Sequence, residues 1–260
     1  MASQVLKNVS IWVDGYDASG QMNALALEYA AESLERTAVN GSTRLKAGGL
    51  KNTRMTHSGF WAADYDAGVF STVGANMPVT IASAGADTGD LAYLAQTLNA
   101  AYKPKLTVGS RAGLTLELEA AGELTRGVVL ANEDTTLASG SSGSVQLGLL
   151  QQTDELFATL HVTELTGGGS LVVKIQSDSD AGFSSPVDRI TFDAATEEVG
   201  QYKSTSLTNT DEYYRAVWTL SAGSAAFAVG VGLRFGVLRS LVTRAGDDIV
   251  LRNNDTLIIR

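Results

Sequence analysis

Residues 114–120 read Leu-Thr-Leu-Glu-Leu-Glu-Ala, and this strict alternation is the clearest indication of fold class in the chain. Successive side chains of a strand point to opposite faces, so the leucines share one face and the glutamates the other. Residues 24–38 (ALALEYAAESLERTA) alternate similarly over their first half, although their composition also suits a helix. We interpret both stretches as strands with one buried and one hydrated face.

Further strands and one helix are expected around these two. Residues 9–13 and 51–61 are strand-like runs, the first of them ended by an Asp-Gly turn signal. After residue 144, short strand-like runs separated by Gly- and Asp-rich turns predict a jelly-roll or immunoglobulin-like β-sandwich. A helix is predicted over residues 88–102, because its apolar residues recur at spacings of three and four and Pro104 follows.

The composition of the chain suggests a division into four parts. A Gly/Ser-rich polar stretch at 132–143 is expected to be a flexible linker, with a long loop inside one domain as the alternative. It would separate a first domain, 1–131, from an outer β-sandwich, 144–235. A C-terminal arm, 236–260, would contain a hairpin over 248–259 that turns at Asn253-Asn254.

Charge and cysteine content exclude several classes of protein. The chain has no cysteine, so disulfides, zinc fingers and cysteine nucleophiles are absent. The net charge is −9, and residues 131–212 alone carry 13 acidic and 3 basic side chains. Such a chain is a poor nucleic-acid binder, because affinity for nucleic acid comes mainly from neutralising phosphates. No apolar run approaches the roughly 20 residues that a membrane-spanning helix needs.

The search for catalytic or metal-binding groups finds no supported site. His57 and His161 are expected to be strand residues with satisfied hydrogen bonds. No nucleophile elbow, phosphate-binding loop or dinucleotide fingerprint is present. Residues 178–182 (DSDAG) resemble the opening of a calcium loop, but Arg189 stands where the bidentate glutamate belongs. We therefore expect no enzyme activity, no cofactor and no metal.

Two surfaces are suited to assembly. The first consists of the small and acidic faces of the alternating strands, either an ordinary hydrated face or the lining of a channel whose carboxylates repel DNA phosphates. Its acidic residues are Glu28, Glu32, Glu117 and Glu119. The second is a glycine-containing basic loop at 36–54, either simply solvated or docked on nucleic acid or on a neighbouring subunit, which we favour because complementary charge fixes register. Its basic residues are Arg36, Arg44, Lys46, Lys51 and Arg54.

A set of short motifs over residues 5–131 resembles the opening of tail-tube (major tail) proteins of long-tailed bacteriophages. The matching segments are 11–17 (IWVDGYD), Ser19-Gly20, Asn23, Glu35-Arg36-Thr37, Arg44, Gly49-Leu50-Lys51, Gly59-Phe60-Trp61 and Arg126-Gly127-Val128-Val129. Residues 171–178 and Gly182-Phe183, with Pro186, are similar to β-sandwich domains appended to phage virion proteins.

The resemblance implies a structural virion protein that forms six-fold rings stacked into a tail tube, through which DNA is ejected. The four glutamates would line the lumen, and the basic loop would stack one ring on the next. The partners would be copies of the same chain and other tail proteins, while DNA passes without specific binding. The protein would reside in the virion tail after assembly in the host cytoplasm, without contacting a membrane.

Two other readings remain open. One is a different phage structural protein, either a capsid decoration protein or a head–tail connector. The other is a carbohydrate-binding module in residues 144–235, with aromatic side chains as a stacking platform. Those side chains are Tyr202, Tyr213, Tyr214 and Trp218.

Overall fold

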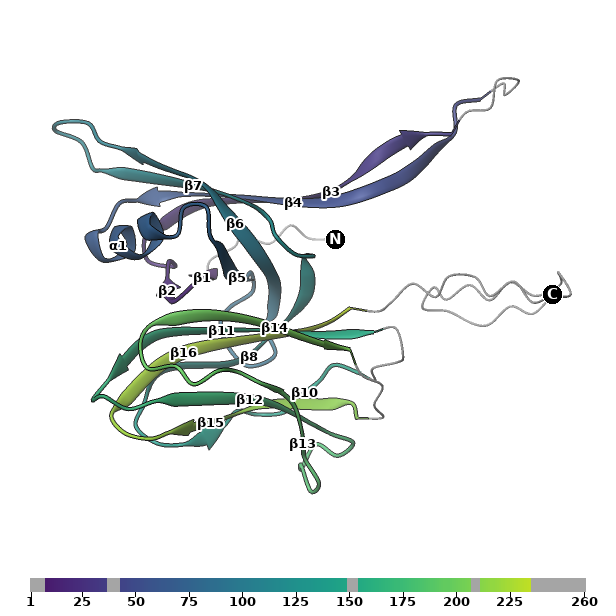
Figure 1. Cartoon of the computed structure of the whole chain (residues 1–260), viewed down its shortest axis with the longest axis vertical. Coiled ribbons are helices and arrows are strands. Elements are labelled where there is room, and N and C mark those ends of the chain that lie inside the picture. Colours follow the sequence, from purple (N-terminus) through teal and green to yellow (C-terminus); the bar gives the residue numbers. More distant parts are fainter. Residues whose placement is uncertain (1–7, 37–42, 149–153, 207–210, 235–260) are drawn as a thin grey trace, which may run out of the picture.

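A computed structural model describes residues 8–36, 43–148, 154–206 and 211–234. This part of the chain contains two antiparallel sheets and one helix (Figure 1). The mainly β fold class with one helix is confirmed.

The elements have the following bounds: β1 Ser10–Val13, β2 Tyr16–Asp17, β3 Met22–Glu35, β4 Lys46–Phe60, α1 Ala63–Ser71, β5 Asn76–Ala82, β6 Leu91–Lys105, β7 Gly113–Ala120, β8 Thr125–Thr136, β9 Gly140–Ser141, β10 Val145–Gln146, β11 Glu155–Thr166, β12 Leu171–Asp178, β13 Val187–Thr191, β14 Val199–Ser206, β15 Tyr213–Leu220 and β16 Ser224–Arg234. The strands predicted around residues 9–13, 24–38, 51–61 and 114–120 correspond to β1, β3, β4 and β7.

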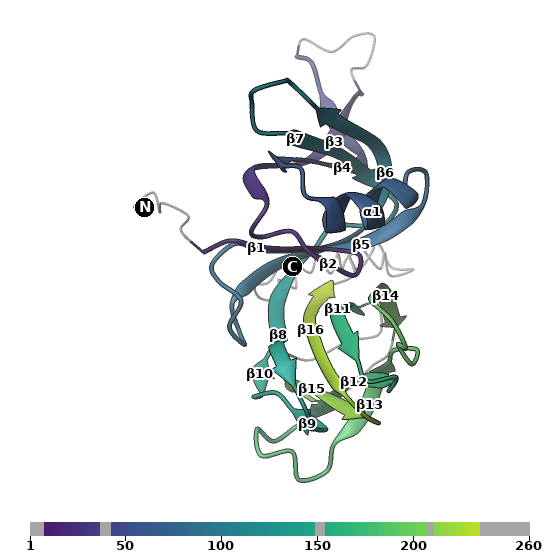
Figure 2. The ribbon, with the colours of Figure 1, turned by 90° about the vertical axis from the view of Figure 1, so that its left-hand side faces the viewer.

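The larger sheet has eleven strands and runs through both halves of the chain. Its main path is β14-β11-β16-β8-β6-β5-β1-β2, and a branch adds β7, β4 and β3 beyond β6. The long strand β6 connects the two parts, because it pairs with β8 at one end and with β7 at the other. The smaller sheet, β10-β15-β12-β13 with β9 beside β15, packs below β8, β11 and β16 (Figures 1 and 2).

Buried apolar side chains form two main cores. One lies between the two sheets of the sandwich and includes Leu160, Val173 and Phe227. The other lies under β3, β4 and β7, where Met55 and Leu116 pack with side chains of β1, β5 and α1. Figure 2 shows α1 beneath the layer of β3, β4 and β7. Burial of these side chains is the main force that holds the layers together.

The prediction of a helix over residues 88–102 is wrong, because residues 91–102 belong to strand β6. The strand buries Ala92 and Leu94 in one cluster, and then Ala95 in the core next to α1. A strand that passes between two cores buries first one face and then the other, which produces the apolar spacing of a helix. The helix of the structure, α1, is short, and its N-cap residue Ala62 makes no side-chain capping bond, so its sequence signal is weak.

The linker prediction for residues 132–143 is also wrong, because β8 extends to Thr136 and β9 follows. The serines of this stretch bond to β15: Ser142 Oγ accepts from Ala216 N at 3.0 Å, and Ser139 Oγ accepts from Leu220 N at 3.0 Å. Gly140 lies so close to the Trp218 ring that a Cβ on it would be 2.8 Å from Cζ2. Gly and Ser serve here for close packing and hydrogen bonding rather than for flexibility.

The other parts of the predicted division stay predictions. Residues 236–260, with the predicted hairpin at 248–259, lie outside the described residues, as do positions 37–42 of the basic loop.

Candidate assembly surface

Most of the predicted acidic residues lie on the outer face of the four-stranded layer β3-β4-β7-β6. Glu28 lies directly across from Arg54, and Arg54 directly across from Glu119. In the next row on this face, Thr56 pairs with Glu117. Three of the four predicted glutamates therefore share one face that points away from the core.

The opposite face of this layer is buried. Its cross-strand neighbours Leu27, Met55 and Leu118 form one row, and Leu25, His57 and Leu116 form the next. Met55, His57, Leu116 and Leu118 are at most 1 % exposed. The alternation predicted from the sequence thus separates a core face from a hydrated face.

The hydrated face is less acidic than the sequence suggests, because two cations lie among its carboxylates. Arg54 contacts Glu119 at 3.0 Å, and the Lys103 ammonium contacts Glu117. The hydrogen bond from Lys103 lowers the pKa of Glu117. Lys103 lies in β6, just after the segment 88–102 that the sequence predicts to be a helix, so sequence reasoning missed its place on this face. The result is a polar surface of paired charges rather than a uniform negative wall.

Glu32 occupies a different environment from the other three glutamates. It lies far along β3, where the register with β4 shifts between Ala31 and Ser33. Its carboxylate lies over Gly49, since a Cβ on that glycine would be 3.1 Å from Glu32 Oε2.

Residues 46–54 of the basic stretch at 36–54 are strand, which corrects the prediction of a flexible loop for this part. β4 begins at Lys46, so Lys46, Lys51 and Arg54 are strand residues paired with β3. Gly48 pairs with Ser33 of β3 and so lies in the ladder despite its conformational freedom, whereas Gly49 lies at the register shift. Arg36 and Arg44 flank positions 37–42, and Lys51 contacts Glu123 at 3.7 Å.

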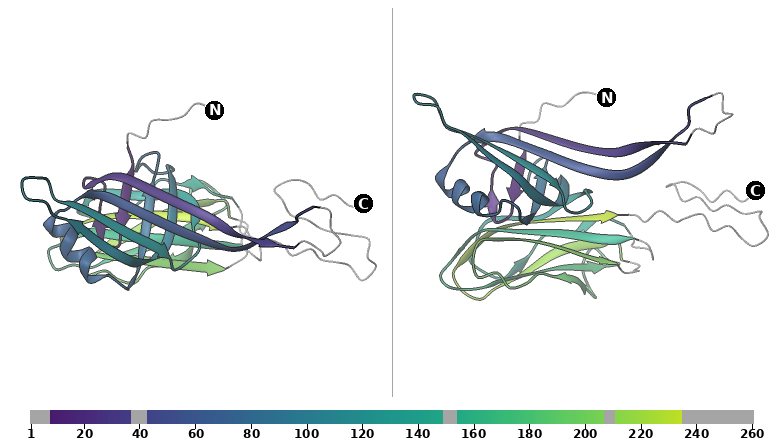
Figure 3. Two further views of the ribbon diagram at one scale, coloured as in Figure 1. Left: turned by 90° about the horizontal axis from the view of Figure 1, so that it is seen from above. Right: turned by 45° about the horizontal axis from the view of Figure 1, so that its top comes forward.

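The β3–β4 hairpin extends well beyond the body of the molecule (Figure 3). Along its outer part, every residue of β3 from Glu28 to Glu35 is exposed. Large apolar side chains are among the exposed residues: Tyr29, Leu34, Leu45 and Leu50, which are 44 to 78 % exposed. Their exposure along one projecting hairpin is a feature that contact with another molecule would cover.

A buried polar network joins β5 and the end of β1 to strand β11 of the sandwich. His161 Nδ1–H donates to the Asp14 carbonyl at 2.6 Å, so its Nε2 accepts from the Thr80 hydroxyl at 2.8 Å. The Thr159 hydroxyl then donates to Thr80 at 2.7 Å. Burial lowers the pKa of His161 to about 4, although the bond to the Asp14 carbonyl opposes this. The expectation of a satisfied strand histidine is confirmed for His161.

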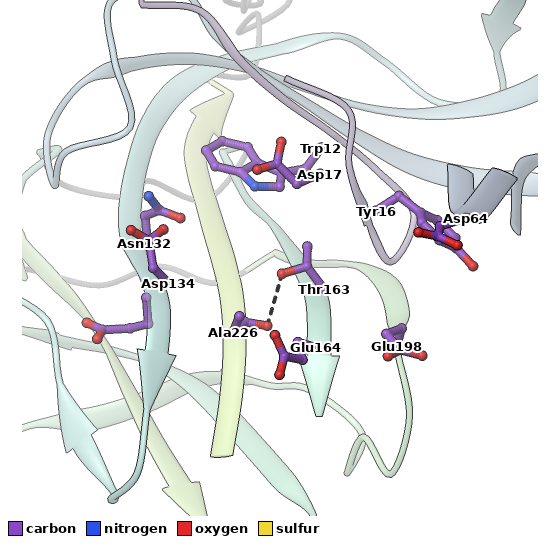
Figure 4. Close-up of a pocket in the computed structure, with 11 residues that line it drawn as sticks. Trp12, Tyr16, Asp17, Asp64, Asn132, Asp134, Thr163, Glu164, Glu198 and Ala226 are labelled. Carbon is purple, nitrogen blue, oxygen red and sulfur yellow. Dashed lines mark hydrogen bonds between the residues drawn. The ribbon is translucent and has the colours of Figure 1, made fainter. Parts of the chain in front are cut away.

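An acidic groove of about 550 Å³ lies at the side of the same junction (Figure 4). Trp12 and Tyr16 line it together with carboxylates from both halves of the chain, and no lysine or arginine is among its lining residues. Those carboxylates belong to Asp17, Asp64, Glu133, Asp134, Glu164 and Glu198. No sequence pattern predicts this groove, because its carboxylates come from separate elements.

The aromatic platform expected for a carbohydrate-binding module is not formed. Tyr214 and Trp218 are buried in the core of the sandwich, and the Trp218 ring packs edge-on against Phe227 at 5.3 Å between centroids. The hydroxyl of Tyr202 is buried as well. Side chains held in a core cannot stack on a sugar.

Within the described part of the chain, no group of three or more His, Asp or Glu side chains is placed to hold a metal ion. Its one helix is too short and too polar to cross a membrane.

Comparison with known proteins gives matches in structure alone. No family model matches the sequence, and neither does any curated protein. The chain is similar to a chain of the virion of a native gene transfer agent particle, with 18 % identity and a TM-score of 0.41, over 48 % of this chain and 98 % of the other. It is also similar to the SPP1 tail tube, with 11 % identity and a TM-score of 0.37, over 45 % and 75 % of the two chains.

A third similarity spans nearly the whole chain. The SPP1 Dit protein, described as a hub of the adsorption apparatus in phages that infect Gram-positive bacteria, shares 10 % identity at a TM-score of 0.35. The match covers 88 % of this chain and 100 % of the other. At these identities and TM-scores the similarities support no argument about function, which must come from the geometry of this chain.

Proposed function

We propose that this chain is a structural subunit of a phage-type tail, which assembles with copies of itself into stacked rings around an aqueous bore. The observation that carries the proposal is the β3–β4 hairpin, whose apolar side chains stand in solvent beyond the body of the subunit. A two-stranded hairpin is marginally stable in water by itself. Docking on a neighbouring copy would bury these side chains and stabilise it.

The hydrated face of β3, β4, β7 and β6 fits the wall of the proposed bore. Its leucine-bearing side is fixed in the core, so Glu28, Glu117 and Glu119 can face only solvent or another molecule. Because Arg54 and Lys103 are engaged by Glu119 and Glu117, they are less available to passing phosphates. Such a wall would let DNA pass without binding it. Glu32 would extend this lining along the hairpin.

The far end of the hairpin fits the proposed contact between rings. Arg36, Arg44 and Lys46 lie at or beyond the ends of β3 and β4, where they can reach an acidic surface of the next ring. Arg54 belongs to the bore face instead, and Lys51 is engaged with Glu123. Six-fold symmetry, a role in DNA ejection, contact with other tail proteins and residence in the virion complete the proposal.

Electron microscopy of the purified protein tests it. Wild-type protein should form rings or tubes in negative stain, and Leu50→Asp should leave folded monomers, because it places a charge in the proposed contact. Leu137→Asp is the matched control, since Leu137 is as exposed as Leu50, at 77 against 78 %, but lies between β8 and β9. Circular dichroism would verify that both variants fold.

Monodisperse wild-type monomers at high concentration would count against self-assembly. Equal assembly of Leu50→Asp and the control would remove the hairpin from the proposed contact. Rings that never stack would point instead to a head–tail connector.

A further inference from the structure

A small cavity of about 10 Å³ lies between the buried face of β4 and α1. His57 of β4 and Tyr65 of α1 both line it, and Gln21 lines it at the edge next to β3. The remaining lining is mostly apolar, with Leu114 and Leu116 of β7 among it. The cavity therefore sits behind the outer face of this layer, at the edge of the core.

Three buried polar side-chain atoms of this lining, in His57 and Tyr65, have no hydrogen-bond partner among the described residues. His57 is 1 % exposed and Tyr65 is 5 % exposed. Within the described residues, neither ring nitrogen of His57 nor the hydroxyl of Tyr65 makes a hydrogen bond. Leaving such a group unsatisfied destabilises the folded state, so native proteins rarely do so.

The chemistry of the two side chains matches a water molecule. A neutral imidazole offers one donor and one acceptor, and a phenol hydroxyl can do both. Water can donate to the acceptor nitrogen of His57 and accept from the Tyr65 hydroxyl at the same time. A cavity of roughly 10–15 Å³ is enough for one water, provided that at least two polar groups hold it.

We propose that one ordered internal water fills this cavity and bridges the imidazole of His57 to the hydroxyl of Tyr65. The water joins α1 to the underside of β4, and so fixes the helix to the layer above it. Gln21 offers a third polar contact at the rim. This site depends on the fold of the single chain and not on its assembly.

The sign of a stability change tests the proposal. If the water bridges the two residues, Tyr65→Phe removes one of its partners and lowers the melting temperature by about 2–4 °C. If the cavity is empty, the same change removes an unsatisfied hydroxyl and raises the melting temperature. Tyr202→Phe is the matched control, because the Tyr202 hydroxyl is also buried without a partner but does not line this cavity. Its melting temperature should stay unchanged or rise.

A high-resolution crystal structure of the full chain supplies the second measurement. A density peak within hydrogen-bond distance of both His57 and Tyr65, absent in Tyr65→Phe, is the expected result. An empty cavity in the wild-type protein, or a higher melting temperature for Tyr65→Phe, would overturn the proposal.

Discussion

At the scale of single residues, the two histidines show how burial controls chemistry. Both lie inside the protein, and burial lowers the pKa of each to about 4. The bond to the Asp14 carbonyl fixes the tautomer of His161, so that its other nitrogen can accept from Thr80. A proton on that nitrogen would turn an acceptor into a donor and disrupt the junction between the two halves.

Acidification should therefore destabilise the protein through His161. The unfolded chain takes up a proton near pH 6.5, but the folded chain does so only near pH 4. The stability that the neutral His161 contributes is fully present above pH 6.5. It is lost as the pH falls towards 4, by about 3 kcal/mol at most. Urea unfolding of wild-type protein and His161→Gln between pH 7 and 4 would measure the difference.

His161→Gln keeps every other titrating group, so the difference between the two pH profiles removes their effects. One of these groups is Asp14, whose pKa is raised by burial. The stability of wild-type protein should fall more steeply with acid than that of His161→Gln. Parallel pH profiles would contradict this assignment.

At the scale of elements, β9 shows that glycine and serine do not always mean flexibility. Gly140 packs against the ring of Trp218, while the Trp218 Nε1–H donates to the Ala138 carbonyl at 3.0 Å. Both contacts come from the stretch that its composition marked as a linker. The stretch is ordered because β15 offers it a packing surface and backbone partners.

Two alanine substitutions in this stretch should separate packing from flexibility. Gly140→Ala pushes a methyl group into the Trp218 ring, and we expect a loss of about 1–3 kcal/mol in the free energy of unfolding. Gly143→Ala is the control, because its Cβ would meet nothing closer than Thr88 Cγ2 at 3.9 Å. Chemical denaturation would measure both, and equal stabilities would restore the linker interpretation.

At the scale of the whole molecule, the larger sheet contains strands from both the earlier and the later part of the chain, which makes the two parts interdependent. β16, from the end of the described chain, pairs with β8 and with β11. β6 continues the sheet from β8 through Leu91–Val128, and the His161 network joins β11 to Asp14 in the first half of the chain. The core beside β8 is therefore incomplete without residues that come nearly one hundred positions later.

A fragment that ends at residue 143 should not reach the native fold. It would expose the side of β8 that β16 covers, where Val229 of β16 lies across from Ala131. Its amide spectrum in solution NMR should be poorly dispersed, whereas the full chain should give a dispersed spectrum. A well-dispersed spectrum from the fragment would show that the first part folds alone, as the predicted domain division implies.

The sequence by itself determined the class of fold, and it placed Glu28, Glu117 and Glu119 each on the side of its own strand that lies opposite the leucines. It could do so because alternation along a strand is a local property, which needs no knowledge of the partner strands. Only the tertiary structure decided that residues 88–102 are a strand, that Arg54 and Lys103 pair with those glutamates, and that the supposed linker is ordered. Each of these depends on which segments lie side by side. Such long-range contacts cannot be read from the local pattern of any single stretch of the chain.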